Sequence, residues 1–162
     1  MGEGILIYGR NRRYVNNLQD FATRVLRDGK ERGSIFHFGM VNPRIAADLR
    51  RGGIELKSSR ISIQDKTILK YIDHPKKAKG ATIDTKRYRM AQNAIAKPKH
   101  IYRDTSKGGF VYIGSKKYSG DKVIKVVLQP NYKKKKRYYN MVTSIGIVNK
   151  ANMNSPQYVK IK

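Results

Sequence analysis

The chain contains no cysteine, and it has only 11 acidic residues and three histidines among its 162 residues. Without cysteine there is no disulfide framework, no thiolate metal site and no catalytic thiol. No stretch approaches the roughly 18 apolar residues that a membrane-spanning helix needs, and the opening segment lacks the pattern of a secretory signal. We therefore do not expect this protein to act at a membrane.

The acidic residues stand singly, and neither a DxD nor an HExxH grouping is present. Such groupings supply the oxygen and nitrogen ligands that hold Mg²⁺ or Zn²⁺. The chain also has no P-loop and no paired carboxylates of the kind used in glycoside hydrolysis. We expect neither a metal site nor a cofactor.

Basic residues are abundant: 36 Lys and Arg give a formal net charge of +25. A charge of this size destabilises a compact state through self-repulsion, so a polyanionic partner is the first hypothesis. Hydrophobic residues make up 39% of the chain, which is enough for a core, and the length fits one ordinary domain.

Apolar residues recur at helical spacing in four segments, each bounded by capping residues, glycine or proline. The first predicted helix covers residues 14–28 and ends at Gly29, and the second covers residues 43–51 after the N-cap Asn42. The third begins at the Ser62–Asp65 capping box and runs to Asp73. The fourth is capped by Asp84 and ends before Pro98.

After Pro98 the pattern changes to alternation, which predicts the strands 100–104, 110–115, 123–129 and 138–148; residues 35–41 and 54–63 are also predicted to be extended. Helices followed by strands predict an α+β domain, with N-terminal helices packed on a four-stranded antiparallel sheet. We assign residues 14–150 to this domain, residues 1–13 to a linker or basic arm, and residues 151–162 to a partly ordered tail.

Basic residues beside tyrosines give the strongest local signal. Cations bind phosphates, and tyrosine rings stack on unpaired bases. A solvated loop and a localisation-type basic run are the alternatives. The predicted nucleic-acid-binding residues are Lys76, Lys77, Lys79, Tyr132, Lys133, Lys134, Lys135, Lys136, Arg137, Tyr138 and Tyr139.

RNA cleavage is one chemistry that needs no metal, because the 2′-OH of RNA supplies the nucleophile. It needs an acid and a base, cations for the phosphorane, and orienting hydroxyls. The candidates for these roles are, in that order, His74 and His100, Arg103 and Lys125, and Thr143 and Ser144. His37 lies between two phenylalanines, is expected to point to solvent, and receives no catalytic role.

Three segments, Leu69–His74, Ala96–Ile101 and Met141–Ser144, carry a family likeness over about residues 35–150. In element order and in these motifs the chain resembles phage-associated nucleases of the barnase–EndoU–colicin–RelE (BECR) fold, which occur as toxin modules on phage head-morphogenesis (MuF-like) proteins. The resemblance implies a microbial-RNase-like fold, a concave sheet face that binds RNA, and an acidic immunity or antitoxin protein as partner.

The resemblance further implies a ribonuclease toxin that acts in the cytoplasm, with tRNA as one candidate target. Delivery would occur as part of a larger phage or secreted protein, to which residues 1–13 would be the linker. Two other readings remain open. The chain is alternatively a non-catalytic RNA- or DNA-binding protein of ribosomal or phage-architectural type, or an assembly protein whose basic surface meets an acidic protein.

Overall fold

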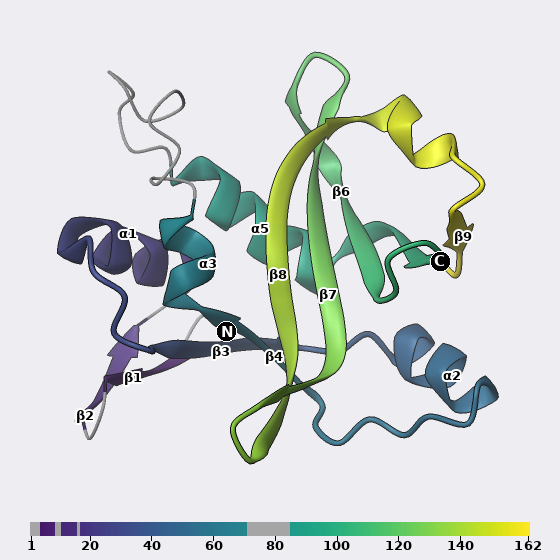
Figure 1. Cartoon of the computed structure of the whole chain (residues 1–162). Helices are drawn as coiled ribbons and strands as arrows, with labels where there is room; N and C mark the ends of the chain where they lie inside the picture. Colours follow the sequence, from purple (N-terminus) through teal and green to yellow (C-terminus); the bar gives the residue numbers. More distant parts are fainter. Residues whose placement is uncertain (1–3, 9–10, 16, 71–84) are drawn as a thin grey trace.

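The computed structural model in Figure 1 describes residues 4–8, 11–15, 17–70 and 85–162. Its strands are β1 Gly4–Tyr8, β2 Asn11–Val15, β3 Ile35–Met40, β4 Arg60–Gln64, β5 Pro98–Asp104, β6 Phe110–Ser119, β7 Lys122–Lys134, β8 Arg137–Asn149 and β9 Tyr158–Lys160. The helices described are α1 Leu18–Asp28, α2 Pro43–Arg51, α3 Asp65–Leu69, α5 Lys86–Ala96 and the 3-10 helix η1 Lys150–Asn154.

The strands form one sheet in the order β2-β1-β3-β4-β8-β7-β6-β5-β9. The α+β class is therefore confirmed, and β5 to β8 are antiparallel neighbours as predicted. The expected limit of four strands is wrong. Within the described residues the sheet has nine strands, and it is mixed, because β4 runs parallel to β8. A parallel pair has no connecting hairpin turn, so the local sequence carries no signal for it.

Segments outside the expected domain also join the sheet. The hairpin of β1 and β2 pairs with β3 through β1, so residues within the expected linker or arm are strand residues. At the other end, β9 pairs antiparallel with β5. Its neighbour Lys162 donates its backbone N–H to the Ile101 carbonyl at 3.2 Å. The expected tail thus forms η1 and the edge strand β9.

The helix boundaries follow from capping. Asn17 accepts the Asp20 N–H at 2.8 Å to start α1, which Gly29 ends in the left-handed conformation at φ 68°. The predicted start at residue 14 was too early, because residues 11–15 form β2. Asn42 caps α2 as predicted, by accepting the Arg44 N–H.

The predicted capping box at Ser62 is wrong. Ser62 lies inside β4, and α3 begins at Asp65 without a side-chain cap. Asp65 instead accepts the backbone N–H groups of Arg32 and Ser34 at 2.8 and 3.2 Å. The carboxylate therefore fastens the loop before β3, a role that local spacing does not reveal.

The main core lies between the sheet and the helices. Helices α1, α2, α3 and α5 all contribute buried residues to one cluster, and the rings of Phe21, Phe36 and Phe38 stack within it. In Figure 1, α1 and α3 lie to the left of the long, bent strands β7 and β8, α5 runs behind these strands, and η1 and β9 lie to their right. A smaller cluster forms there around Met153, Val111 and Ile113.

Candidate nucleic-acid interface

The sheet face opposite the helices carries polar and aromatic side chains from both ends of the sheet. Cross-strand partners share a face, so the pairing of Lys125 with Gly146 and with Ile113, and of Ile113 with His100, places them together. We call this surface the open face and define it by His37, His100, Tyr102, Lys125, Val127, Tyr132, Lys134, Tyr139, Ser144, Gly146 and Tyr158.

Three rings form a row at one end of the open face. His100 and Tyr102 meet edge to face with centroids 6.0 Å apart, and Tyr102 meets Tyr158 in the same way at 6.1 Å. All three side chains are partly exposed. Burial raises the pKa of Tyr102, so its phenol is neutral at physiological pH. Neutral rings of this kind are platforms on which unpaired bases stack.

Lys125 ends this aromatic row and supplies a positive charge. Its Nζ donates to the Tyr158 hydroxyl at 3.2 Å and lies 5.3 Å from the centre of that ring.

The carboxylate of Asp104 lies near this row. Burial alone would raise the pKa of Asp104, but the Lys107 N–H and the Gln157 amide bind the carboxylate, and the net effect is a lowered pKa. Asp104 is thus ionised and held by its own loop.

The predicted catalytic hydroxyls differ in their placement. Val127 pairs with Ser144, whereas Leu128 pairs with Val142, so Thr143 is the extra residue of a β-bulge. The bulge lets Val142 enter the core while Ser144 lies on the open face. The Thr143 backbone carbonyl accepts a hydrogen bond from the Lys70 ammonium at 2.6 Å.

The basic run forms the tip of the β7–β8 hairpin. Lys133 and residues 135–137 are exposed. Lys134 is partly buried, because its ammonium donates to the Gln64 side-chain oxygen at 2.5 Å. The hairpin therefore presents a cluster of exposed cations and fixes one of its lysines against β4.

The three tyrosines of this run are divided between the two sides of the hairpin. Tyr132 and Tyr139 are cross-strand partners on the open face. Tyr138 pairs with Lys133 on the other side and is 39% exposed. The Nζ atoms of Lys57 and Lys133 lie 4.8 and 5.9 Å from its ring centre.

A histidine that sequence reasoning set aside lies next to Tyr139. His37 Nδ1 is 2.7 Å from the Ser62 hydroxyl, and its ring stacks on Tyr139 with centroids 6.2 Å apart. Burial, and then the charge of Arg60, lower the pKa of His37. The imidazole is therefore neutral at pH 7. Alternation along β3 places it away from the core, but it is partly buried against Ser62 and Tyr139, so the prediction that it points to solvent holds only for the face of the sheet.

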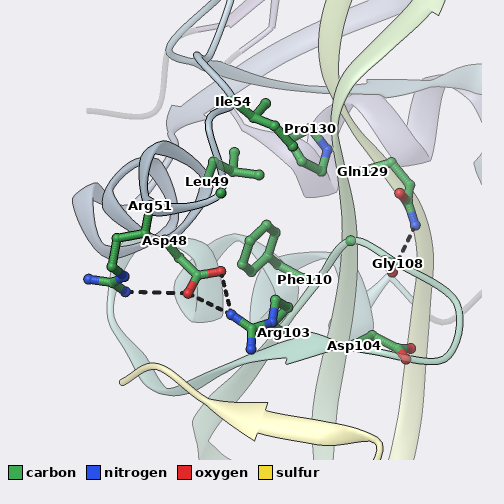
Figure 2. Close-up of a pocket in the computed structure, with 12 residues that line it drawn as sticks. Asp48, Leu49, Arg51, Ile54, Arg103, Asp104, Gly108, Phe110, Gln129 and Pro130 are labelled. Carbon is green, nitrogen blue, oxygen red and sulfur yellow. Dashed lines mark hydrogen bonds and ion pairs between the residues drawn. The ribbon is translucent and has the colours of Figure 1, made fainter.

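The structure does not bring Arg103 together with His100 and Lys125. Residues three apart on a strand face opposite ways, so Arg103 lies on the helix side. There its Nη1 donates to both oxygens of Asp48 from α2, at 2.9 and 3.1 Å (Figure 2). Arg103 is thus separated by the sheet from the residues with which it was expected to act.

His100 lies on the open face, and its Nδ1 is 3.2 Å from the Lys162 carbonyl. Burial lowers the pKa of His100; the bond to the carbonyl opposes this effect, and the charges of Lys160 and Lys99 add to it. The other predicted histidine, His74, and the predicted basic residues Lys76, Lys77 and Lys79 lie outside the described residues.

Sequence reasoning missed Tyr102 and Tyr158. Tyr102 shares a face with His100 two residues away, so alternation along the predicted strand was a usable signal. No local signal identifies Tyr158, because its position depends on the pairing of β9 with β5.

Comparisons with protein-family models, with curated proteins and with solved structures found no match. Across the described ranges, every helix is too short or too polar to cross a bilayer. The same part of the chain contains no group of three or more His, Cys, Asp or Glu side chains placed to hold a metal ion.

Proposed function

We propose that the protein binds single-stranded RNA on the open face. One observation carries this proposal: the aromatic row and Lys125 lie at one end of that face, and Tyr132, Tyr139 and the basic hairpin lie at the other. Along β7, Lys125 and Lys134 are separated by about 30 Å. The face thus carries stacking platforms and cations at both of its ends, over a length that suits several nucleotides.

A single strand fits this surface better than a duplex, because the rings need unpaired bases. The hydroxyl of Ser144 and the ring nitrogens of His37 and His100 offer hydrogen bonds to the 2′-OH, which DNA lacks. RNA is therefore the expected ligand, and a DNA oligomer of the same sequence is expected to bind more weakly.

Fluorescence anisotropy with a labelled 12-nucleotide RNA tests this proposal at 50 and 200 mM KCl. Replacing Tyr102 with Ala removes a stacking platform worth about 1–3 kcal/mol, or roughly 5- to 150-fold in Kd. Lys125→Ala is expected to reduce the slope of log Kobs against log[salt] by about 0.7 for each phosphate that the variant no longer neutralises.

The matched control is Lys30→Ala, which removes the same charge from an exposed position just after α1. It is expected to leave the affinity within twofold of the wild type. Equal losses in Lys30→Ala and Lys125→Ala would show that the net charge alone drives binding, and would contradict an interface on the open face.

RNA cleavage without a metal is a second candidate function, favoured by two histidines on the open face whose pKa values are lowered. A neutral imidazole removes the 2′-OH proton, the 2′-oxygen attacks phosphorus, and the 5′-oxygen leaves with a proton from an acid. His37 and His100 lie five strand spacings apart along the sheet, so we propose each as a separate candidate base.

Incubation with total tRNA in EDTA, followed by a denaturing gel, tests this second function. Fragments that appear with the wild type and disappear in His37→Gln, His100→Gln or His74→Ala would identify the base. Binding without fragments between pH 5 and 8 would limit the function to RNA binding.

From the BECR resemblance alone, we further propose a toxin role with an acidic immunity or antitoxin partner. A chain of charge +25 is most simply neutralised by a complementary negative surface. Induced expression in bacterial cytoplasm is expected to arrest growth, and a variant that has lost cleavage is expected not to do so. Unchanged growth with the intact chain would contradict this role.

A further inference from the structure

A pocket of about 570 Å³ lies where α2 meets the end of β5, the start of β6 and the middle of β7. Its volume is in the range of small-molecule sites, 300–1,000 Å³. Figure 2 shows Leu49, Ile54 and Pro130 on one side of the pocket and the charged groups of Asp48 and Arg103 on another. The walls are thus divided into an apolar part and an ionic part.

In the ionic part, two guanidinium groups pair with the same carboxylate. Asp48, whose side chain is 6% exposed, accepts from Arg103 at 2.9 and 3.1 Å and from Arg51 at 3.3 Å. Arg51 and Arg103 remain 70% and 44% exposed. One carboxylate neutralises one of the two charges, so this wall keeps a net positive charge and N–H groups that face solvent.

A second carboxylate in the lining, that of Asp104, lies apart from the arginines, beside the glycine loop in Figure 2. Its Oδ1 is occupied by the N–H groups of Ser106 and Lys107 and by the Gln157 amide, each at 3.0 Å. It therefore does not compete with Asp48 for the guanidinium groups.

The apolar part includes an aliphatic side chain that the protein leaves partly uncovered. Ile54 is 48% exposed, and it lies beside Leu49 and Pro130 at the pocket. Beside Pro130, the Gln129 amide points toward the glycine loop and makes one long hydrogen bond, 3.4 Å, to the Gly108 carbonyl. A flat, partly apolar ring with polar edges would cover the aliphatic groups and bind the amide.

We propose that this pocket binds a nucleotide unit, with the phosphate on Arg51 and Arg103 and the base between the apolar wall and Gln129. Guanidinium groups bind phosphate through paired N–H donors, and the adjoining apolar surface suits a base. Asp48 and the two arginines are on the helix side of the sheet, whereas the pairing of Gln129 with Met141 puts the Gln129 side chain on the other face. Phosphate binding by the arginines therefore does not depend on RNA binding by the open face. The nucleotide is either free or part of an RNA strand.

Amide NMR titration with adenosine 5′-monophosphate tests the pocket. The expected result is a set of shifts at Gly108, Gly109 and the Gln129 side chain, with adenosine binding at least fivefold more weakly than the monophosphate. Arg51→Ala is expected to weaken monophosphate binding at least fivefold. Arg51 is mostly exposed, so its removal is not expected to unfold the chain.

Arg50→Ala is the matched control, since Arg50 precedes Arg51 on α2 and pairs with Glu55 at 3.7 Å, outside the pocket lining. Equal losses in Arg50→Ala and Arg51→Ala, equal binding of adenosine and the monophosphate, or shifts confined to other residues would each overturn the proposal.

The 12-nucleotide RNA separates the two sources of the nucleotide. Weaker RNA binding by Arg51→Ala would place a unit of the strand in the pocket, whereas unchanged RNA binding beside weaker monophosphate binding would assign the pocket to free nucleotides. Loss of RNA binding in Lys125→Ala with no monophosphate shifts at the pocket would overturn this inference and leave the proposed function standing.

Discussion

Asn131 donates its backbone N–H to the side-chain oxygen of Asn140 at 3.3 Å. Asn140 is fully buried, and its amide nitrogen donates to the carbonyls of Ser58 and Arg60 at 2.6 and 2.9 Å. One side chain therefore joins the bend in β7 to the start of β4. It helps to hold β4 parallel to β8, the pairing that unites the two halves of the sheet.

Asn140→Leu is expected to lower the free energy of unfolding by about 3 kcal/mol, because it leaves buried backbone groups without partners. Urea denaturation followed by circular dichroism measures this. Asn149→Ala is the control, since Asn149 is exposed and its side chain caps nothing. A loss below about 1 kcal/mol in Asn140→Leu would contradict the bridging role.

Lys135→Gly is expected to stabilise the chain by about 0.5–1 kcal/mol. Lys135 has φ 56°, a left-handed conformation that costs a side-chain-bearing residue about 1–2 kcal/mol, part of which the greater freedom of glycine in the unfolded state offsets. Thermal unfolding measures the change. Lys136→Gly, at the neighbouring turn position without a positive φ, is expected to give no gain, and an equal gain there would contradict the explanation.

His37 is expected to make stability depend on pH. Its folded-state pKa is lowered, chiefly by burial, so as the pH falls below 6.5 the unfolded state takes up a proton before the folded state does. The stabilising contribution is therefore present above the unfolded pKa and is lost as the pH falls towards the folded pKa. Between pH 7.5 and 5.5 the wild type should lose more stability in urea than His37→Gln. Identical losses would show that His37 does not contribute.

Two substitutions of Tyr158 separate stacking from hydrogen bonding in the proposed RNA binding. Tyr158→Phe keeps the ring and frees the Lys125 ammonium from the hydroxyl, so RNA affinity is expected to stay within twofold. Tyr158→Ala removes the platform, and about 5-fold or greater weakening is expected. Anisotropy with the 12-nucleotide RNA measures both variants. Equal weakening by Phe and Ala would place the effect in the hydroxyl instead of the ring.

Local sequence signals predicted the elements that local interactions build. The caps Asn42 and Gly29 and the alternation after Pro98 lie within a few residues of the structure they specify, so α1, α2 and the antiparallel strands β5 to β8 were visible in the sequence. The Ser62–Asp65 spacing misled for the converse reason. The carboxylate of Asp65 is taken by Arg32 and Ser34, more than thirty residues away.

The sequence by itself determined the composition of this protein: a strongly basic chain with enough apolar residues for a core, no cysteine chemistry, and tyrosines beside its lysines. Strand alternation alone already puts Arg103 on the side of the sheet opposite His100, so that separation was readable from the sequence. Only the tertiary structure decided which distant residues come together. The pairing of β9 with β5 brought Tyr158 to Lys125, and this result depends on an interaction between distant segments, which the burial of apolar surface selects and no local pattern encodes.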